Sequence, residues 1–335
     1  MIRKVTIRDV AAASGVSITA VSQILNGKGQ RFSSETQEKV HHFQHKLGYV
    51  PDFSARHLII KSTETIGVLT PDLANPFFSM FIKGVQQTAC EENFIPLIFS
   101  ANHDEHLETS YLQELIRRAV DGLIIASASI TAQAIDQSLR RNGIPYILLD
   151  QNAVSDGDRV NVDDRHGGEL AAQHLLSLGH TQIAVVVPEH ATVNIINRLN
   201  GFIDWMKSTG HPFSDDWIVH TPMNKEGGYE AASQECVKRA TAIFAINDEM
   251  AIGLYRGLRE RGLRIPEDIS VIGYDDIDWG NYVTPALTTI HQPVFEMGQA
   301  ATQLLTQRIR ADNRPFQTVR LPVRLVKRES TGMAR

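Results

Sequence analysis

Polar and aromatic side chains follow the short apolar runs of the sequence at the points where those runs end. The residues concerned are Asn75, Phe77, Phe78, Asp150, Asn247 and Asp275. Carboxylates and carboxamides bind hydroxyl groups through paired hydrogen bonds, and aromatic rings stack on the C–H faces of a sugar. This chemistry predicts a site for a sugar-like molecule. A plainer interpretation stays open, since Asn or Asp after a strand often caps a helix and the phenylalanines could belong to a core.

A second group of candidate binding residues lies near the N-terminus. At 100° per residue, Ile18, Thr19, Ser22 and Gln23 fall on one arc of a helix, opposite an apolar arc. Hydroxyls and carboxamides can hydrogen-bond to base edges, and an outward isoleucine can contact a thymine methyl group. The arc therefore predicts a DNA-reading surface. A small helical bundle that only packs on the rest of the protein would show the same periodicity.

The sequence lacks the motifs of common catalytic and metal sites. It contains no G-x-G-x-x-G, no Walker lysine loop and no H-E-x-x-H. The side chains of Asp275 and Asp276 point apart because the residues are adjacent, and no partner acid or nucleophile is identifiable. His41 and His45 have i, i+4 spacing, which a solvated helix face explains without a metal. We predict no enzyme activity, no catalytic residue, no metal and no cofactor.

Three short helices are predicted to position the N-terminal group. Thr6 to Asp9 has the spacing of a capping box and opens a helix that runs to about Ser14. Gly15 permits a tight turn, Ser17 can cap a second helix, and a third helix is predicted from near Ser33 to Leu47. Val40, Phe43 and Leu47 form its buried stripe. Three helices with a glycine turn between the first two match the helix-turn-helix plan.

From Thr65 onward, short apolar strands alternate with helical stretches. Runs this apolar are buried on both faces, as in parallel sheets covered by helices, so we predict an α/β fold with two doubly wound lobes. Ligands bind at the carboxyl ends of such strands. The predicted strands are 66–69, 96–99, 122–125, 146–149, 183–186, 242–245 and 271–273.

Composition and charge limit the function further. The 335 residues suit two or three domains, and two distant cysteines, Cys90 and Cys236, exclude a disulfide framework. Although the net charge is −5, residues 1–61 carry nine Lys or Arg against four Asp or Glu. A basic N-terminal segment followed by an acidic remainder of the chain indicates that the N-terminal segment alone binds phosphates. Without an apolar stretch of about 20 residues, we expect a cytoplasmic protein with no membrane contact.

The N-terminal residues identify a family. Val5–Ala11, Ser14–Ser17, Ala20–Ser22 and Leu25-Asn26 closely resemble the start of the lactose/galactose repressor family of bacterial transcriptional regulators. The resemblance implies operator binding with base readout by Ile18, Thr19 and Gln23. The wider set of expected DNA-binding residues is Thr6, Ser17, Ile18, Thr19, Ser22, Gln23, Asn26 and Arg31.

Two departures from the family pattern concern operator sequence. Gln23 stands where many members have Arg, and Gln can pair bidentately with adenine whereas Arg pairs with guanine. The loop before Phe32 is one residue longer than in several relatives.

The stretch from Pro51 to Lys61 resembles the hinge of the same family. By that resemblance Ala55 and Leu58 contact DNA, with Leu58 wedged into the minor groove at the operator centre, where apolar insertion bends the duplex. So short a segment should be only marginally helical without DNA. Leu58 could instead be an ordinary buried linker residue.

The rest of the chain resembles this family and the periplasmic ribose-type binding proteins. The effector contacts implied are Asn75, Phe77, Phe78, Asp150, Arg198, Met223, Asn247, Asp275 and Gln292. The segments Asn75–Phe78 and Asn247–Ala251 most resemble the ribose-binding segments of these relatives, as in ribose-operon repressors. Gln151 and Met223 depart from that pattern, so a hexose, a nucleoside or a purine stays an alternative to ribose or a related pentose. Arg198 and Asp275 are expected on opposite sides of the sugar.

These features together predict a homodimeric repressor of a sugar-utilisation operon. It would bind a palindromic double-stranded operator and be controlled allosterically by an effector between two lobes. The expected domains are a headpiece 1–49, a hinge 50–62, a first lobe 63–160 and 291–320, and a second lobe 161–290 and 321–335. The alternative is a non-transcriptional cytoplasmic sugar-binding protein.

Overall fold

The computed structural model describes residues 5–50, 62–102, 104–127, 129–149, 157–311 and 314–335. The chain divides into two compact units, Met1–Thr63 and Glu64–Arg335, which are described separately. The hinge stretch from Pro51 to Lys61, with Ala55 and Leu58, and the residues Asp150 and Gln151 lie outside the described residues. The expected minor-groove wedge and the Asp150 contact therefore stay predictions.

The first unit is the expected helix-turn-helix. Its helices are α1 Ile7–Ser14, α2 Ile18–Leu25 and α3 Ser34–Leu47. The Thr6 backbone N–H donates to Asp9 Oδ2 at 2.8 Å, as a capping box requires. Gly15 has the left-handed φ of 68° that the turn after α1 needs. The second helix is capped by the Ser17 hydroxyl, which accepts a hydrogen bond from the Ala20 N–H at 3.2 Å.

The first unit has a small apolar core of its own. Its fully buried members are Val10, Ala11, Val21, Ile24 and Val40. The predicted stripe of α3 is buried only at Val40, while Phe43 and Leu47 are half-buried at the edge of this core. The apolar arc of α2 packs in the core. Its other arc therefore remains at the surface, where Ile18 is 46% exposed.

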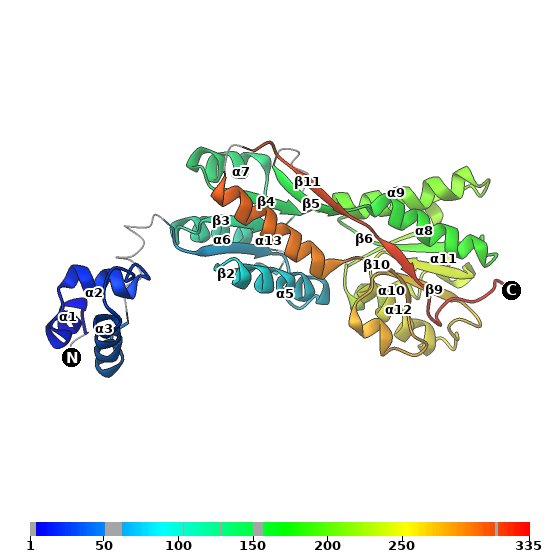
Figure 1. Ribbon diagram of the computed structural model, residues 1–335. Helices are drawn as coiled ribbons and strands as arrows, with labels where there is room; N and C mark the ends of the chain where they lie inside the picture. Colours follow the sequence, from blue (N-terminus) through cyan, green and yellow to red (C-terminus); the bar gives the residue numbers. More distant parts are fainter. Residues whose placement is uncertain (1–4, 51–61, 103, 128, 150–156, 312–313) are drawn as a thin grey trace. The chain divides into compact units, whose positions relative to one another are not determined.

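The second unit contains two six-stranded sheets (Figure 1). The first sheet has the order β11-β5-β4-β3-β1-β2, and every neighbouring pair is parallel. Its strands are β1 Thr65–Thr70, β2 Ile95–Ser100, β3 Gly122–Ile125, β4 Tyr146–Leu149, β5 Asp158–Val162 and β11 Thr318–Leu321.

Helices cover both faces of this sheet. They are α5 Pro76–Glu91, α6 Glu105–Arg117, α7 Ala132–Ser138, η1 Arg140–Asn142 and α13 Val294–Arg310. Ile66 and Val68 belong to the core cluster that contains residues of α5 and α13, whereas Leu69 and Leu123 belong to the cluster that contains residues of α6 and α7. Alternate residues of a strand thus serve opposite faces, which explains why the strands are apolar without interruption.

The second sheet has the order β12-β10-β9-β8-β6-β7, parallel except for β12, which runs antiparallel to β10. Its strands are β6 Ile183–Pro188, β7 Ile218–Thr221, β8 Ala242–Ala245, β9 Ser270–Asp275, β10 Thr288–His291 and β12 Arg324–Val326. The accompanying helices are α8 Asp164–Ser177, α9 Val193–Ser208, η2 Asp215–Trp217, α10 Lys225–Ala231, α11 Glu235–Arg239, α12 Asp248–Glu260 and η3 Asp278–Asn281. In Figure 1 the packed pairs α8–α9 and α10–α12 lie on opposite sides of these strands.

The chain passes between the two sheets three times. It leaves the first sheet after Val162, returns after His291 to form α13, and leaves again between Leu321 and Arg324. The predicted lobe boundary at 160/161 falls inside β5, two residues before that strand ends. The division of the chain into lobes at the expected residues remains a prediction.

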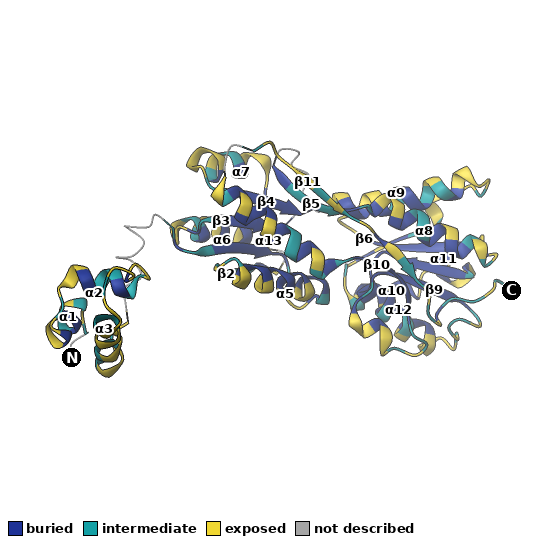
Figure 2. Ribbon diagram, in the orientation of Figure 1, coloured by how far each residue is buried: buried dark blue, intermediate teal, exposed yellow. Residues whose placement is uncertain are grey.

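Every strand predicted from an apolar run forms within two residues of its expected bounds. The expected α/β fold with two parallel-sheet lobes is therefore confirmed. Figure 2 shows that buried residues follow the strands and the inner faces of the helices, with exposed residues outside. None of the described helices is long and apolar enough to span a membrane.

Helices α8 and α9 touch backbone to backbone through two glycines. A Cβ on Gly168 would lie 1.9 Å from the carbonyl oxygen of Arg198, and a Cβ on Gly201 would lie 1.9 Å from that of Arg165. Both distances are far shorter than atoms permit, so only glycine allows this approach. The contact holds the backbone of Arg198 against α8.

We predict that Gly168→Ala destabilises the second unit, because the methyl group must push α9 away from α8. Overpacking of this kind typically costs about 1 to 3 kcal/mol. Chemical denaturation monitored by circular dichroism measures the change. Gln173→Ala, at an exposed position of the same helix, is the control and should stay within about 0.5 kcal/mol of wild type. Equal stability of the two variants would contradict the close helix contact.

Candidate functional site

The outward arc of α2 carries the residues expected to read DNA. Ile18 and Thr19 are exposed in the first turn, and Ser22 and Gln23 are half-buried one turn later. Thr6 and Ser17 are exposed cap residues at the starts of α1 and α2. A helix N-terminus with a hydroxyl cap offers backbone N–H groups to a phosphate.

The loop after α2 returns toward the same surface. Asn26 Nδ2 donates to the Ser22 carbonyl oxygen at 2.7 Å, which ties the loop to the helix end. The Arg31 guanidinium donates to Gln23 Oε1 and lies 5.0 Å from the centre of the Phe32 ring. Asn26 and Arg31 are thus near Ser22 and Gln23, as a shared DNA-binding surface requires.

The predicted effector residues gather at the carboxyl edges of the two sheets. Strand order reverses at β1 and β3 in the first sheet and at β6 and β8 in the second, which are the positions where doubly wound folds bind ligands. Asn75 follows β1 and Asn247 follows β8. Asp275 ends β9, and Gln292 follows β10.

Arg198, in the second turn of α9, is buried with its charge. Its Nε donates to Asp164 Oδ1 at 2.7 Å, and its Nη1 donates to the Ile246 carbonyl oxygen at 3.1 Å. The guanidinium lies 3.8 Å from the centre of the Tyr274 ring. The neighbouring carboxylates and the ring raise the pKa of Arg198 above its ordinary value despite burial, so it stays a cation.

Asp275 and Gln292 form a buried pair beside Arg198. Gln292 Nε2 donates to Asp275 Oδ1 at 2.7 Å, and Arg198 Nη1 is 3.7 Å from the same oxygen. Burial raises the pKa of Asp275 to about 7, against the opposing effects of Arg198 and Gln292. The other amide atom of Gln292, Oε1, is buried and has no hydrogen-bond donor among the described residues.

Two further acids were not predicted as part of this cluster. Burial also raises the pKa of Asp164, which accepts from Arg198 and, at 3.4 Å, from the Tyr274 hydroxyl. Asp248 is fully buried and accepts from Thr289 Oγ1 at 2.7 Å. Burial and, second, the Asp275 charge raise the pKa of Asp248 well above its ordinary value. The edge therefore holds more acids than cations.

The two predicted asparagines cap helices. Asn75 Oδ1 accepts from the Phe77 N–H at 2.8 Å, and Asn247 Oδ1 accepts from the Met250 N–H at 2.9 Å. A carboxamide whose oxygen caps a helix still has its NH₂ group as a donor. The plainer interpretation is thus correct for the oxygens, and ligand binding by the amides stays a prediction.

The predicted apolar contacts are more buried than an open stacking surface. Phe77 and Phe78 are 7% and 3% exposed and pack edge to face, with ring centres 5.1 Å apart. Both belong to a core cluster, against which the half-buried Met223 also packs. Their contact with a ligand stays a prediction.

The expected placement of Arg198 and Asp275 on opposite sides of a sugar is wrong. Both belong to the second sheet's edge, and the 3.7 Å between Nη1 and Oδ1 leaves no room for a sugar ring between these atoms. Although 77 positions separate the two residues in the sequence, the fold brings the side chains from α9 and β9 directly together.

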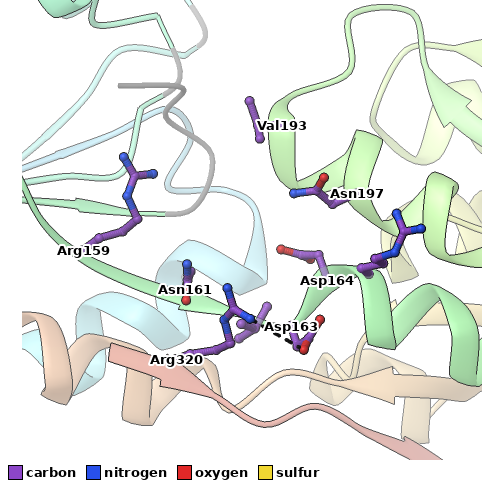
Figure 3. A pocket seen from close by; sticks show the side chains of 9 residues that line it. Arg159, Asn161, Asp163, Asp164, Val193, Asn197 and Arg320 are labelled. Carbon is purple, nitrogen blue, oxygen red and sulfur yellow. Dashed lines mark ion pairs between the residues drawn. The ribbon is translucent and has the colours of Figure 1, made fainter. Parts of the chain in front are cut away.

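A cavity of about 400 Å³ opens where the chain passes between the sheets (Figure 3). It is lined by Arg159, Asn161, Val162, Asp163, Asp164, Arg165, Val193, Asn197 and Arg320. Asp164 belongs to both the cavity wall and the Arg198 cluster, so the two adjoin. The sequence analysis missed these residues, although the pair Asp163-Asp164 after the strand pattern of 158–162 could have indicated them.

Comparison with known proteins supplies the context for these sites. Residues 6–52 match the model described as bacterial regulatory proteins, lacI family, and residues 172–331 match the periplasmic binding protein-like domain. The chain is 37% identical to the HTH-type transcriptional regulator DegA of Bacillus subtilis, over 98% of both chains.

Two solved structures are informative. A LacI family transcriptional regulator from Enterococcus faecium with bound ribose is 44% identical, with a TM-score of 0.76 over 81% of this chain and 100% of that one. A Lac repressor dimer bound to operator and the anti-inducer ONPF is 28% identical, with a TM-score of 0.86 over 98% of this chain and 100% of that one.

The raised pKa of Asp275 predicts a specific pH dependence of stability. Between about pH 4 and 7 the folded protein holds a proton on Asp275 that the unfolded chain releases, so this group's contribution to stability is lost as pH rises through 7. Asp275→Asn keeps the acceptor for Gln292 and cannot ionise. We expect the variant to gain stability relative to wild type, by a few kcal/mol, as pH rises from 4 to 8.

Asp276→Asn is the matched control, because the pKa of Asp276 is lowered, through hydrogen bonds from His291 and Arg328 that outweigh its burial. Its contribution is fully present above the unfolded pKa of about 4 and is lost only as pH falls below it, so the stability of this variant relative to wild type should stay nearly constant between about pH 5 and 8. Melting temperatures measured across the pH range compare the two. The same slope for both variants would contradict the assignment.

Proposed function

The chain belongs to the lacI family of bacterial regulatory proteins, and from this premise we propose that it is a transcriptional repressor whose operator binding is controlled by a sugar-like effector. The family consists of DNA-binding transcriptional regulators, not enzymes. The operator, the effector and the controlled genes are the parts that we propose here.

The first unit supports sequence-specific DNA binding. The surface of α2 combines an exposed isoleucine with hydroxyl and carboxamide groups, while Val21 and Ile24 of its apolar arc pack in one core with Val10 and Val40. An exposed isoleucine can contact a thymine methyl group without giving up any packing in the core. The hydroxyls can bind bases or phosphates. We propose Thr6, Ser17, Ile18, Thr19, Ser22, Gln23, Asn26 and Arg31 as the contacts, with Ala55 and Leu58 from the hinge.

The observation that carries the effector proposal is the Asp275–Gln292 pair. Gln292 Oε1 is a buried acceptor without a donor among the described residues, next to a carboxylate that also accepts. Leaving a buried acceptor unpaired costs about 1 to 3 kcal/mol, which a ligand hydroxyl would remove. Two adjacent acceptors fit the neighbouring hydroxyls of a sugar.

The ribose bound by the E. faecium relative supports a pentose. We propose ribose or a related pentose, bound by Asn75, Phe77, Phe78, Asp150, Arg198, Met223, Asn247, Asp275 and Gln292. A hexose, a nucleoside or a purine is the alternative effector class.

We further propose a cytoplasmic homodimer that binds a palindromic operator, as the Lac repressor dimer binds its operator. In this proposal the headpiece 1–49 and the hinge 50–62 bind DNA, and the two lobes bind the effector. Effector binding would change how the lobes of the two protomers meet, and so change the spacing of the headpieces. Coupling of this kind is reciprocal between the two ligands.

A thermal-shift screen of the full chain tests the effector class. Pentoses, hexoses, phosphorylated sugars, nucleosides and purines are compared at equal concentrations, since a ligand of the folded state alone raises the melting temperature. The expected result is the largest shift with ribose or another pentose. A shift only with nucleosides or purines would replace the pentose proposal by its alternative.

Arg198→Ala and Asp275→Ala should weaken effector binding on the order of tenfold to a hundredfold. Each removes a hydrogen-bonding partner of ligand hydroxyls, and hydrogen bonds to charged groups such as Arg198 are worth roughly 1.5 to 3 kcal/mol. Calorimetric titration measures the affinity, and circular dichroism checks that each variant folds. The control is Asp216→Ala, an exposed carboxylate of the same lobe. Wild-type affinity in a folded Asp275→Ala variant would overturn the proposed site.

Deleting residues 1–61 should abolish operator binding and leave effector affinity within about twofold, because the first unit carries the basic residues that neutralise phosphates. Gel-shift and calorimetric titrations measure the two affinities on one preparation. If the truncated chain still shifted operator DNA, the headpiece would not be the DNA-binding unit. If the full chain bound the sugar but no DNA, the non-transcriptional alternative would hold.

A further inference from the structure

The loop between α2 and α3 is fixed against the DNA-reading helix. The Lys28 N–H donates to the Gln23 carbonyl oxygen at 2.8 Å, and the Phe32 N–H donates to the Gly29 carbonyl oxygen at 2.8 Å. Phe32 packs against the core of the first unit, and Gln37 Nε2 donates to its carbonyl oxygen at 3.0 Å. Both ends of the loop are therefore anchored.

Arg31 is held between two partners of this anchored loop. Its guanidinium lies 5.0 Å from the Phe32 ring centre on one side and donates to Gln23 Oε1 on the other. A guanidinium has no acceptor, so the Gln23 atom facing it must be the amide oxygen. This contact fixes the orientation of the Gln23 amide, whose NH₂ group then faces away from Arg31.

We propose that Gln23 and Arg31 act together as one base-reading group that turns its donors toward the base and selects guanine. The proposal deepens the proposed function and depends on it. The pair offers the Gln23 NH₂ and the remaining guanidinium N–H groups as donors, and its one acceptor, Gln23 Oε1, already has one of its two lone pairs engaged by Arg31. Guanine offers two major-groove acceptors, N7 and O6, whereas adenine offers N7 beside a donor, its N6 amino group.

This pairing changes the expectation for Gln23 alone. Bidentate binding of adenine needs the carboxamide oxygen to accept from the N6 amino group. In this chain that oxygen accepts from Arg31, which holds it on the Arg31 side of the amide and engages one of its two lone pairs. A glutamine at this position thus gains the preference for guanine that an arginine would have.

The test is a selection of binding sites by the full chain from operator libraries randomised at every half-site position. Wild type should select guanine over adenine at one position per half-site. Arg31→Ala frees Gln23 Oε1, so at that position the preference should move toward adenine by about tenfold, while preferences at the other positions stay unchanged.

Lys28→Ala is the matched control, since it removes the same charge from the same loop. It should weaken binding to all sequences equally and lower the salt dependence, without changing base preference. If Arg31→Ala behaved as Lys28→Ala does, with guanine still selected, Arg31 would be a phosphate contact and the paired reader would be wrong, although the repressor proposal would stand.

A double-mutant cycle adds an independent readout. If the two side chains read as one group, discrimination between guanine and adenine should be lost to the same extent in Gln23→Ala and in Gln23→Ala with Arg31→Ala. Additive losses would overturn the proposal. A wild-type chain that selects no sequence at all would overturn the repressor function itself.

Discussion

One buried cation, the guanidinium of Arg198, joins most of the elements at the carboxyl edge of the second sheet. It binds α8 through Asp164, the end of β8 through the Ile246 carbonyl oxygen, and β9 through Asp275 and the Tyr274 ring. A charge removed from water is tolerated only when partners replace its hydration. The positions of these elements therefore depend on one another through a single side chain.

The same constraint explains the unusual acids around it. Asp164, Asp275 and Asp248 lie within one buried region, where Arg198 lowers the pKa of Asp164 and Asp275, whereas the neighbouring charges of Asp275 and Asp276 raise that of Asp248. Burial disfavours their ionised forms more than one guanidinium can offset, so all three pKa values rise. A ligand that brings hydroxyl donors would relieve this imbalance. Since Asp164 directly follows the passage from β5 to α8, such relief would act on a connection between the two sheets.

The parts of the fold that the sequence predicted are those set by local pattern. Helix caps at Thr6 and Ser17 and the strands made of continuous apolar runs depend on near neighbours and formed as expected. Strands β5, β7, β10, β11 and β12 were missed, because polar or charged residues such as Asn161, His220 and Arg320 interrupt their apolar character. These strands are specified by their partners in the sheet, which lie far away in the chain.

For the candidate site, too, local sequence indicated individual residues but not how they are arranged. Arg198 and Gln292 were predicted as effector contacts from the family resemblance, and Asn247 and Asp275 also from their positions after strands; their contact with an effector stays a prediction. Their relation to one another was not predicted, because it depends on Asp164 and on the glycine contact between α8 and α9. Distances across a packed core are set by side-chain volumes on several elements at once, which no single segment of sequence contains.

The three passages between the sheets have a consequence for synthesis. Strand β11 completes the edge of the first sheet beside β5, and Arg308 of α13 binds the buried Asp158 with two hydrogen bonds at 2.7 and 3.0 Å. These partners are 150 residues apart, and most of the second sheet is encoded between them. On a ribosome the headpiece can fold as soon as it emerges, but the first lobe must wait, with the apolar strands β1, β3 and β4 unfinished, until nearly the whole chain has been made. Contacts of such high sequence separation make folding slow, so this lobe is the part of the nascent chain that exposes unpaired apolar strands to aggregation for longest.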